Sequence, residues 1–252
     1  MTQPLEGFTV GITADRRWAE QAELLRRHGL TVVHAPCIRT LPLGAEDGVR
    51  AATDAVIARP PDFLVANTAW EAAFAGMRTF VVLYIIDGLN QPLYVSSTVL
   101  AVVAAGYVLA AAIATRFGDH WGLGNVILGA SVVYGLGLLG AGFATTWHWW
   151  YYGIIFPVAM AGGTVMTLAW GLLFKIIPAG DRGTISGLAV TARGLGLVIG
   201  PLSAGAAIDI LRPYLSSTDG YAAVWPVMAI PILAAIPLVA RLADAEASGS
   251  RR

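Results

Sequence analysis

The chain has 252 residues, of which 56% are hydrophobic and only 13% are charged, and its formal net charge at pH 7 is zero. That composition excludes a disordered chain and an ordinary soluble protein, and it indicates membrane-spanning segments. It also argues against a nucleic-acid partner, because neutralising phosphates needs a clustered basic surface. The single cysteine, Cys37, excludes a disulfide framework and a cysteine-based metal site. We therefore expect no metal and no cofactor.

The charged residues are distributed unevenly along the chain. Residues 1–77 hold 7 Arg and 9 Asp or Glu, whereas the much longer stretch 78–252 holds 9 Arg or Lys and 7 Asp or Glu. The change in charge density predicts two unlike parts that meet between Asn67 and Arg78. We assign them as an incomplete α/β lobe at 1–68, a junction at 69–78, an apolar part at 79–245 and a short tail at 246–252.

The first part has the pattern of alternating strands and helices. The expected elements, in chain order, are strand Phe8–Thr13, helix Arg17–His28, strand Leu30–His34, helix Ala45–Ile57 and strand Phe63–Ala66. The start of the chain lacks a basic stretch followed by an apolar run, so no signal peptide is expected. We therefore expect this part to lie in the cytosol.

Three runs in this part, GFTVGITADRR, EQAELLRRHGLTVVHAPCIRTLPL and RPPDFLVANT, resemble the amino-terminal stretch of uroporphyrinogen-III synthase. That family closes linear hydroxymethylbilane into the tetrapyrrole ring, in a cleft between two lobes that need about the length of this whole chain. The resemblance implies that Thr13, Arg16 and Thr68 could face such a cleft; otherwise they are caps and turn residues. Because neither lobe can be completed here, we predict that synthase activity is absent.

The second part contains apolar runs that are long enough to cross a bilayer. The six expected spans lie at about 79–91, 93–115, 123–147, 149–174, 183–211 and 221–240. Arg78, Arg116, Lys175, Arg182 and Arg241 would then fall on one side, which the bias of basic residues toward the cytoplasm makes the inner one. We expect a multi-pass protein of the inner (plasma) membrane with both termini in the cytoplasm. The aromatic run at 147–152 would mark the outer interface.

Three further segments are similar to motifs of the major facilitator superfamily: ATRFGDHWG at 114–122, PAGDRGTISGL at 178–188 and RGLGLVIGPLSAG at 193–205. The first departs from the family pattern at His120, where a permanently basic residue is usual. The resemblance implies a secondary transporter of small solutes, built from two six-helix halves around a site near the membrane midplane. This chain would supply the carboxyl-terminal half. We expect it to need a second half or a homodimer to work.

Two charges fall inside the expected spans, Asp87 and Arg193, each about 13 to 15 Å from the cytoplasmic end at the rise of a helix. An unpaired charge at that depth is costly. One hypothesis is that they pair with each other or line a polar cavity with Asn90 and Gln91. The alternative is that Asp87 ends a broken helix and Arg193 extends its side chain to the surface.

Two further groups of residues come from the motif segments. The candidates for a cytoplasmic gate, or equally for loop solvation and topology, are Arg116, Gly118, Asp119, Asp181 and Arg182. The candidates for close helix packing and a hinge are Gly196, Gly200, Pro201, Ala204 and Gly205.

Three interpretations of the whole chain remain open. The first is a transporter half-bundle with a synthase-like leader, whose partners are the bilayer, an unidentified solute and a second half. The second is a tethered enzyme of tetrapyrrole (heme) biosynthesis, inactive because it is truncated. The third is a junction product, made by a genomic deletion or an assembly error that joined two neighbouring genes, because the run VANTAWEAAFAGMRTF does not look like a linker.

Overall fold

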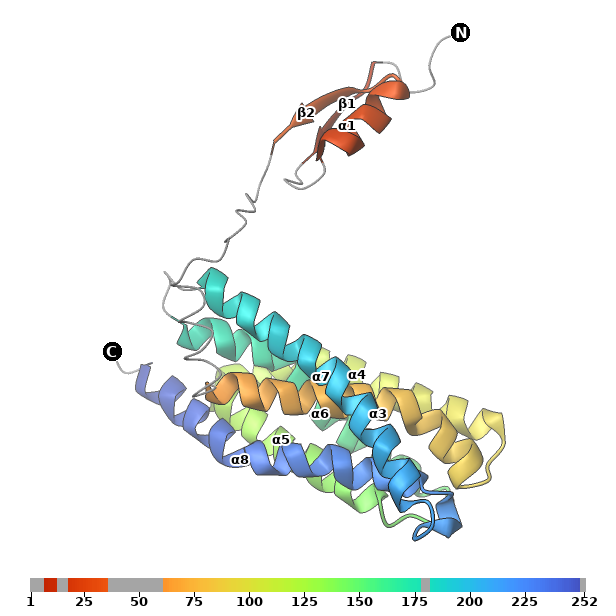
Figure 1. The fold of residues 1–252 in the computed structure, drawn as a ribbon. Helices are drawn as coiled ribbons and strands as arrows, with labels where there is room; N and C mark the ends of the chain where they lie inside the picture. Colours follow the sequence, from red (N-terminus) through yellow and green to blue (C-terminus); the bar gives the residue numbers. More distant parts are fainter. Residues whose placement is uncertain (1–6, 13–17, 36–60, 178–181, 250–252) are drawn as a thin grey trace. The chain divides into compact units, whose positions relative to one another are not determined.

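A computed structural model describes residues 7–12, 18–35, 61–177 and 182–249 of the chain. The chain forms two compact units, residues 1–59 and residues 60–252, whose labelled elements are drawn in Figure 1. Each unit is described by itself.

The first unit is a strand, helix, strand unit made of β1 (Thr9–Ile12), α1 (Trp18–Arg27) and β2 (Thr31–His34). The two strands pair in parallel, as the connecting helix requires. Gly29 follows α1 with a φ of 91°, a conformation that glycine adopts without strain, and so ends the helix. This order of elements confirms the sequence prediction for residues 8–34. The predicted helix at 45–57 lies outside the described residues.

The second unit is a bundle of six long helices. They are α3 (Asp62–Leu83), α4 (Leu93–Trp121), α5 (Leu123–Ala141), α6 (Tyr151–Ile176), α7 (Arg182–Leu211) and α8 (Val224–Gly249). A π-helical turn, η1 (Tyr84–Gly88), extends α3, and two short 3₁₀ turns, η3 (Ser216–Thr218) and η4 (Tyr221–Ala223), precede α8. Six helices are long and apolar enough to cross a membrane, which confirms a mainly α-helical membrane fold.

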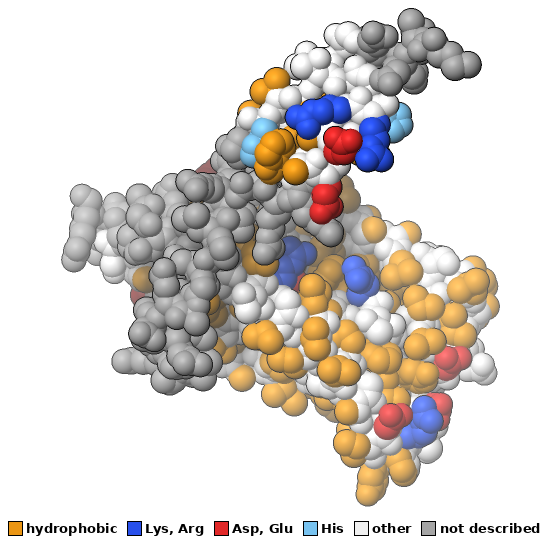
Figure 2. Space-filling view, turned by 45° about the horizontal axis from the view of Figure 1, so that its top comes forward, with side chains coloured by type: hydrophobic (Ala, Val, Ile, Leu, Met, Phe, Trp, Pro, Cys, Tyr) orange, Lys and Arg blue, Asp and Glu red, His pale blue; other side chains and the backbone are white. Residues whose placement is uncertain are grey.

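Two ends of this bundle can be distinguished. At the basal end α3, α5 and α7 begin and α4, α6 and α8 end; there Glu246 of α8 contacts both Lys175 of α6 and the start of α5. At the distal end the other helix termini meet, and Tyr84 of η1 bonds to the backbone after α5. Hydrophobic side chains are spread over the bundle surface that Figure 2 shows, and few charged side chains lie among them, as on a lipid-facing surface.

The structure corrects the predicted boundary between the two parts. Residues 63–66 are not a strand but the first turn of α3, and the predicted junction at 69–78 lies inside this helix. Pro61, in an extended conformation, precedes the helix and fixes its start. Trp70, inside the predicted junction, is fully buried in the bundle core. A short apolar run has no periodicity that separates a strand from a helix, and this caused the error.

The earlier start of α3 also changes the first span, which was predicted at 79–91. The helix and its π turn together run from Asp62 to Gly88. Arg78 is therefore not at the cytoplasmic end of a span: it lies 16 residues after Asp62, about 24 Å along the helix axis.

Candidate functional site

A polar seam joins α3 to α7 at mid-depth in the bundle. Arg193 Nε lies 3.4 Å from Glu71 Oε1, and the carboxylate is buried while the arginine side chain keeps 51% of its surface exposed. Two further polar side chains of α3 bond to the backbone of α7. Asn67 Nδ2 donates to the Ala189 carbonyl at 3.3 Å, and the Thr68 hydroxyl lies 3.2 Å from the Ala192 carbonyl. We call Asn67, Thr68, Glu71 and Arg193 the α3–α7 seam.

The seam overturns the predicted pair between Asp87 and Arg193. Glu71 is nine residues and Arg193 eleven residues from the start of its helix, so both lie about 14 to 16 Å from the basal end. Asp87 belongs to η1, near the distal end of the same helix as Glu71, and its side chain is exposed. It is out of reach because α3 begins 17 residues before the predicted span.

Asn90 and Gln91, expected to line a polar cavity with Asp87, form the turn between η1 and α4. Asn90 has a φ of 51° and is exposed, and Gln91 Nε2 donates to the Leu89 carbonyl at 2.9 Å. Neither residue lines the cavity described below. Their contacts are those of a helix-connecting turn.

Thr68, assigned to a strand end that could face a substrate cleft, is also part of α3. Its hydroxyl lies 2.8 Å from the carbonyl of Leu64, one helical turn earlier. Thr13 and Arg16, the other two cleft candidates, lie outside the described residues.

Glycines on α7 allow this helix to approach α3 closely. A β-carbon at Gly196 would lie 2.8 Å from the Thr68 carbonyl oxygen, and one at Gly200 would collide with the backbone of Ala72. Ala204 is fully buried on the same stripe, whereas Gly205 is only in ordinary contact with α3. Pro201 lies inside α7, where it removes one helical hydrogen bond.

Arg78 is a second cationic residue near the middle of a membrane-spanning helix. It follows Glu71 by seven residues and so lies on nearly the same face of α3, since seven residues complete almost two helical turns. Its side chain is exposed and forms no ion pair or hydrogen bond with any described residue. A lipid-facing arginine at this depth would be costly.

A second polar cluster closes the basal end of the bundle. Glu246 of α8 accepts hydrogen bonds from the backbone N–H groups of Gly124 at 2.6 Å and Leu123 at 3.2 Å. Lys175 Nζ of α6 donates to the same carboxylate at 2.7 Å. The carboxylate thus caps the positive end of α5 and joins three helices. We call this arrangement the Glu246 cluster.

Three of the predicted gate residues, Arg116, Gly118 and Asp119, lie near the basal end of α4 and form no hydrogen bond with Glu246. Arg116 and Asp119 are exposed in the last turns of α4 and form no ion pair within the described residues. Gly118, between them, is buried against the side chain of Leu123. Arg182 is the first residue of α7, and Asp181 lies outside the described residues.

Sequence reasoning missed Glu71, Lys175 and Glu246. Glu71 was counted with the soluble part, and Glu246 was assigned to the tail. One signal was available: Glu71 is an isolated acid in the Ala-rich run AWEAAFAG, which favours a helix. No signal in the sequence joins Glu246 to the start of α5, because 122 residues separate it from Gly124.

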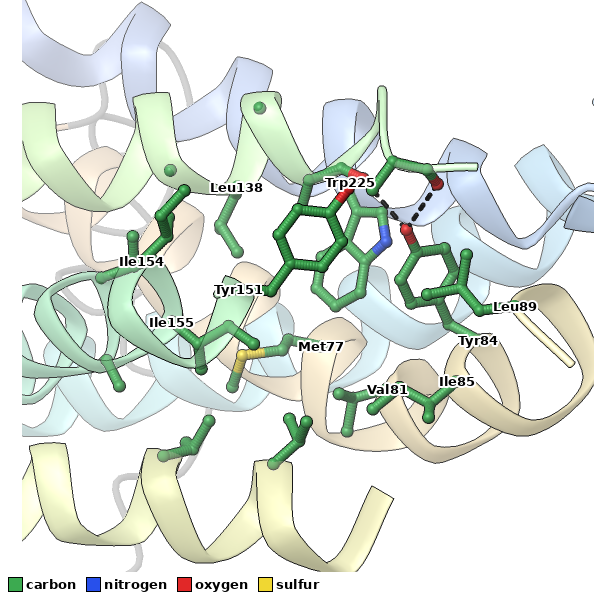
Figure 3. A pocket seen from close by; sticks show the side chains of 18 of the residues that line it. Met77, Val81, Tyr84, Ile85, Leu89, Leu138, Tyr151, Ile154, Ile155 and Trp225 are labelled. Atoms are coloured by element: carbon green, nitrogen blue, oxygen red, sulfur yellow. Dashed lines mark hydrogen bonds between the residues drawn. The ribbon is translucent and has the colours of Figure 1, made fainter. Parts of the chain in front are cut away.

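An apolar cavity of about 340 Å³ lies in the distal half of the bundle, enclosed by residues of α3, η1, α4, α5, α6 and α8 and by the turn before α6 (Figure 3). Tyr84 forms part of its wall, and its hydroxyl lies 2.8 Å from the Ala144 carbonyl and 3.1 Å from that of Ala141. Trp225 packs edge-on against Tyr84, with ring centroids 5.0 Å apart. None of the described residues that line this aromatic cavity is charged.

The described residues contain no group of three or more His, Cys, Asp or Glu that could hold a metal ion. A long helical bundle with buried charges at mid-depth and at one end has the architecture of a membrane transporter. The family profile of the Major Facilitator Superfamily matches residues 29–201 and residues 72–251. The chain belongs to the major facilitator superfamily. It is a multi-pass, transporter-like membrane protein.

No curated protein and no solved structure matches the chain. The superfamily match extends from residue 29 to residue 251 and gives no support to a synthase-like leader. The same match gives no support to the interpretation of the chain as a fusion or as a truncated protein. The residues of the predicted junction bind the rest of the bundle closely, because Glu71 and Ala72 meet Gly196 and Gly200 of α7.

Proposed function

We propose that this chain is one six-helix half of a secondary transporter of small solutes, which works with a second half in the plasma membrane. The second half is either a copy of this chain or a separate chain. The observation that carries the proposal is the pair of exposed cations at mid-depth, Arg78 and Arg193. Charged side chains inside a membrane protein face a water-filled path or another protein surface rather than lipid.

The burial of the helices supports the same conclusion. An 18-residue apolar stretch is 22% buried in α4 and 28% buried in α7, against 56% in the α3 span and 50% in the α8 span. Arg193 projects from α7, one of the two least buried helices. A second half that covers this side would place the seam and Arg78 between two walls, as a central transport path requires.

The charges at the two ends support an orientation. Lys175 and Arg241 lie at the basal end, whereas the distal turns hold Arg212, which pairs with Asp219 at 3.4 Å. The bias of basic residues toward the cytoplasm then favours a cytoplasmic basal end and cytoplasmic termini. In this orientation Arg116 and Asp119, unpaired on α4, are available to bind the second half as a gate. Asp181 and Arg182 precede and begin α7 at the same end, and Gly200-Pro201 is the proposed hinge.

Photo-cross-linking from a single cysteine in native membranes tests the second half directly, because a benzophenone maleimide attached to that cysteine reacts with C–H bonds of any adjacent chain. Because Cys37 is the single cysteine, a Cys37→Ser background allows one new cysteine to be placed at will. Leu197→Cys lies one turn beyond Arg193 on α7 and is 40% exposed. The control, Val133→Cys, is 47% exposed on α5, which packs against α6 and α8.

We expect illumination to cross-link the labelled Leu197→Cys chain to a second polypeptide and to leave the labelled Val133→Cys chain monomeric. A product of twice the chain mass identifies a copy of this chain, and a captured chain of another mass that peptide sequencing shows to be a six-helix protein of the same superfamily identifies a separate half. Equal cross-linking of both variants, or none in either, would contradict a specific second half on α7.

A further inference from the structure

The wall of the aromatic cavity contains the one π-helical turn in the described residues. The Leu89 N–H bonds to the Tyr84 carbonyl at 2.8 Å, five residues earlier, which is the spacing of a π helix. Tyr84 and Ile85 are buried in this turn and line the cavity. A π turn inside a long helix is rare and frequently accompanies a functional site.

Rings from six segments line the space. They belong to Tyr84, Tyr107, Tyr134, Phe143, Trp147, Trp150, Tyr151 and Trp225. In Figure 3 the Tyr151 ring projects into the space from α6, near Leu138 and Ile155. Such a wall offers a bound molecule apolar burial and edge-to-face ring contacts. An ion would lose its hydration there without meeting an opposite charge.

Three buried donors in the lining lack a well-formed hydrogen bond: the hydroxyls of Tyr107 and Tyr134, which lie near each other, and the indole N–H of Trp225, which lies near the Tyr84 hydroxyl. Both tyrosine rings lie against Gly162, where a β-carbon would be 2.9 Å from the Tyr107 hydroxyl. Buried donors without partners are uncommon in folded proteins.

The size of the cavity is suitable for binding a small molecule. About 340 Å³ is within the range of small-molecule sites. Gly140 of α5 lines the space, and a β-carbon built on it meets nothing within 4 Å. Gly140 is exposed, so a side chain added there has room at the edge of the cavity.

We propose that the aromatic cavity binds an uncharged, mainly apolar aromatic molecule, and that this is the class of solute the protein carries. The second clause rests on the proposed transport function, whereas binding itself does not. A membrane acyl chain shares the apolar character but makes little use of a wall built from rings.

Two dyes that share one skeleton test the class. N-phenyl-1-naphthylamine is uncharged, and 8-anilino-1-naphthalenesulfonate is the same molecule with an added sulfonate. Each is titrated, by its fluorescence, into the full chain in lipid nanodiscs and into empty nanodiscs. We expect saturable binding of the uncharged dye, at least about tenfold tighter than that of the sulfonate. Binding equal to that of empty nanodiscs, or tighter binding of the sulfonate, would overturn the proposal.

Substitutions that place a large side chain in the cavity test whether the uncharged dye binds there. Gly140→Phe should weaken binding of the uncharged dye at least about tenfold. Gly129→Phe is the matched control, because Gly129 lies on the same helix, has open space at its β-carbon and does not line the cavity. Ile155→Trp is a second filling variant. Unchanged binding in both filled variants would place the dye elsewhere and overturn the assignment.

Two further measurements separate the alternatives. If half of the uncharged dye is displaced at a lower concentration of 1-decanol than of naphthalene, the cavity binds an alkyl chain and the proposed aromatic class is wrong. Flux of the dye through sealed vesicles tests transport independently. Binding without flux would contradict the proposed transport of this class, and flux that survives cavity filling would contradict the cavity as the solute site.

Discussion

At the basal end of the bundle one buried carboxylate, that of Glu246, joins three helices, whereas at the distal end aromatic rings line a cavity of about 340 Å³. The basal contacts are charged and short, and they lose most of their energy when the atoms move apart. The distal contacts are apolar and depend weakly on direction. The comparison shows that specific charged contacts join the helices at the basal end, whereas contacts among apolar rings predominate at the distal end.

The α3–α7 contact lies between the two ends, and its loss should have the largest effect. Gly200→Leu places a side chain into the backbone of Ala72, so we expect at least about 3 kcal/mol of destabilisation or no folded protein. Gly194→Leu, on the same helix with open space at its β-carbon, should stay near wild type. Thermal unfolding in detergent measures both. Similar losses in the two variants would contradict the close approach.

The fixed basal end can be weakened alone. Glu246→Gln keeps the shape but removes the charge that binds Lys175 and the start of α5, and we expect about 2 to 3 kcal/mol of destabilisation. Dye binding at the distal end should not change. Asp244→Asn, exposed on the preceding turn of α8, is the control, expected within about 0.5 kcal/mol of wild type. An equally small effect for both would show that the cluster does not hold this end.

The seam should show a smaller, pairwise effect. A double-mutant cycle of Glu71→Ala and Arg193→Ala should give a coupling free energy of about 1 to 2 kcal/mol, reduced because the arginine is half-exposed. Asp87→Asn should have no coupling with Arg193→Ala. Coupling of Arg193 to Asp87 rather than to Glu71 would restore the partner that the sequence predicted.

The smallest effect is expected at the distal wall. Tyr84→Phe removes the hydroxyl that bonds to the backbone after α5, at a cost of about 1 kcal/mol, and leaves the ring that lines the cavity. Tyr94→Phe is the control, because that side chain is 71% exposed. Chemical denaturation of the purified protein compares the two variants. Equal stability would show that this hydrogen bond contributes little to the distal end.

Much of the fold could be predicted, because the apolar runs are long and their ends carry charges or turn residues. Five of the six long helices begin within three residues of the predicted starts. The sixth, α3, was missed because its first half holds Asp62 and Glu71 and resembles the polar stretch before it. Burial against α7 makes this half of the helix part of the membrane unit, and no local pattern reports that burial.

The candidate site was less predictable than the fold. Depth along a helix can be calculated from a sequence, but the identity of an ion-pair partner depends on which helices pack together. Arg193 was recognised as an intramembrane charge, and Glu71 was found to be its partner only through the α3–α7 contact. The aromatic cavity could not be predicted, because its lining comes from segments spread from Met77 to Trp225.

The position of Glu246 limits how the carboxyl terminus can be engineered. The residue that fixes the basal end lies only six positions before the last residue of the chain. A purification tag or fluorescent fusion that replaces residues from 246 onward would uncap α5, although it removes less than a thirtieth of the chain. Fusions should therefore start after Gly249, the end of α8. A variant truncated at Ala245 offers a simple way to loosen one end of the bundle without touching the cavity at the other.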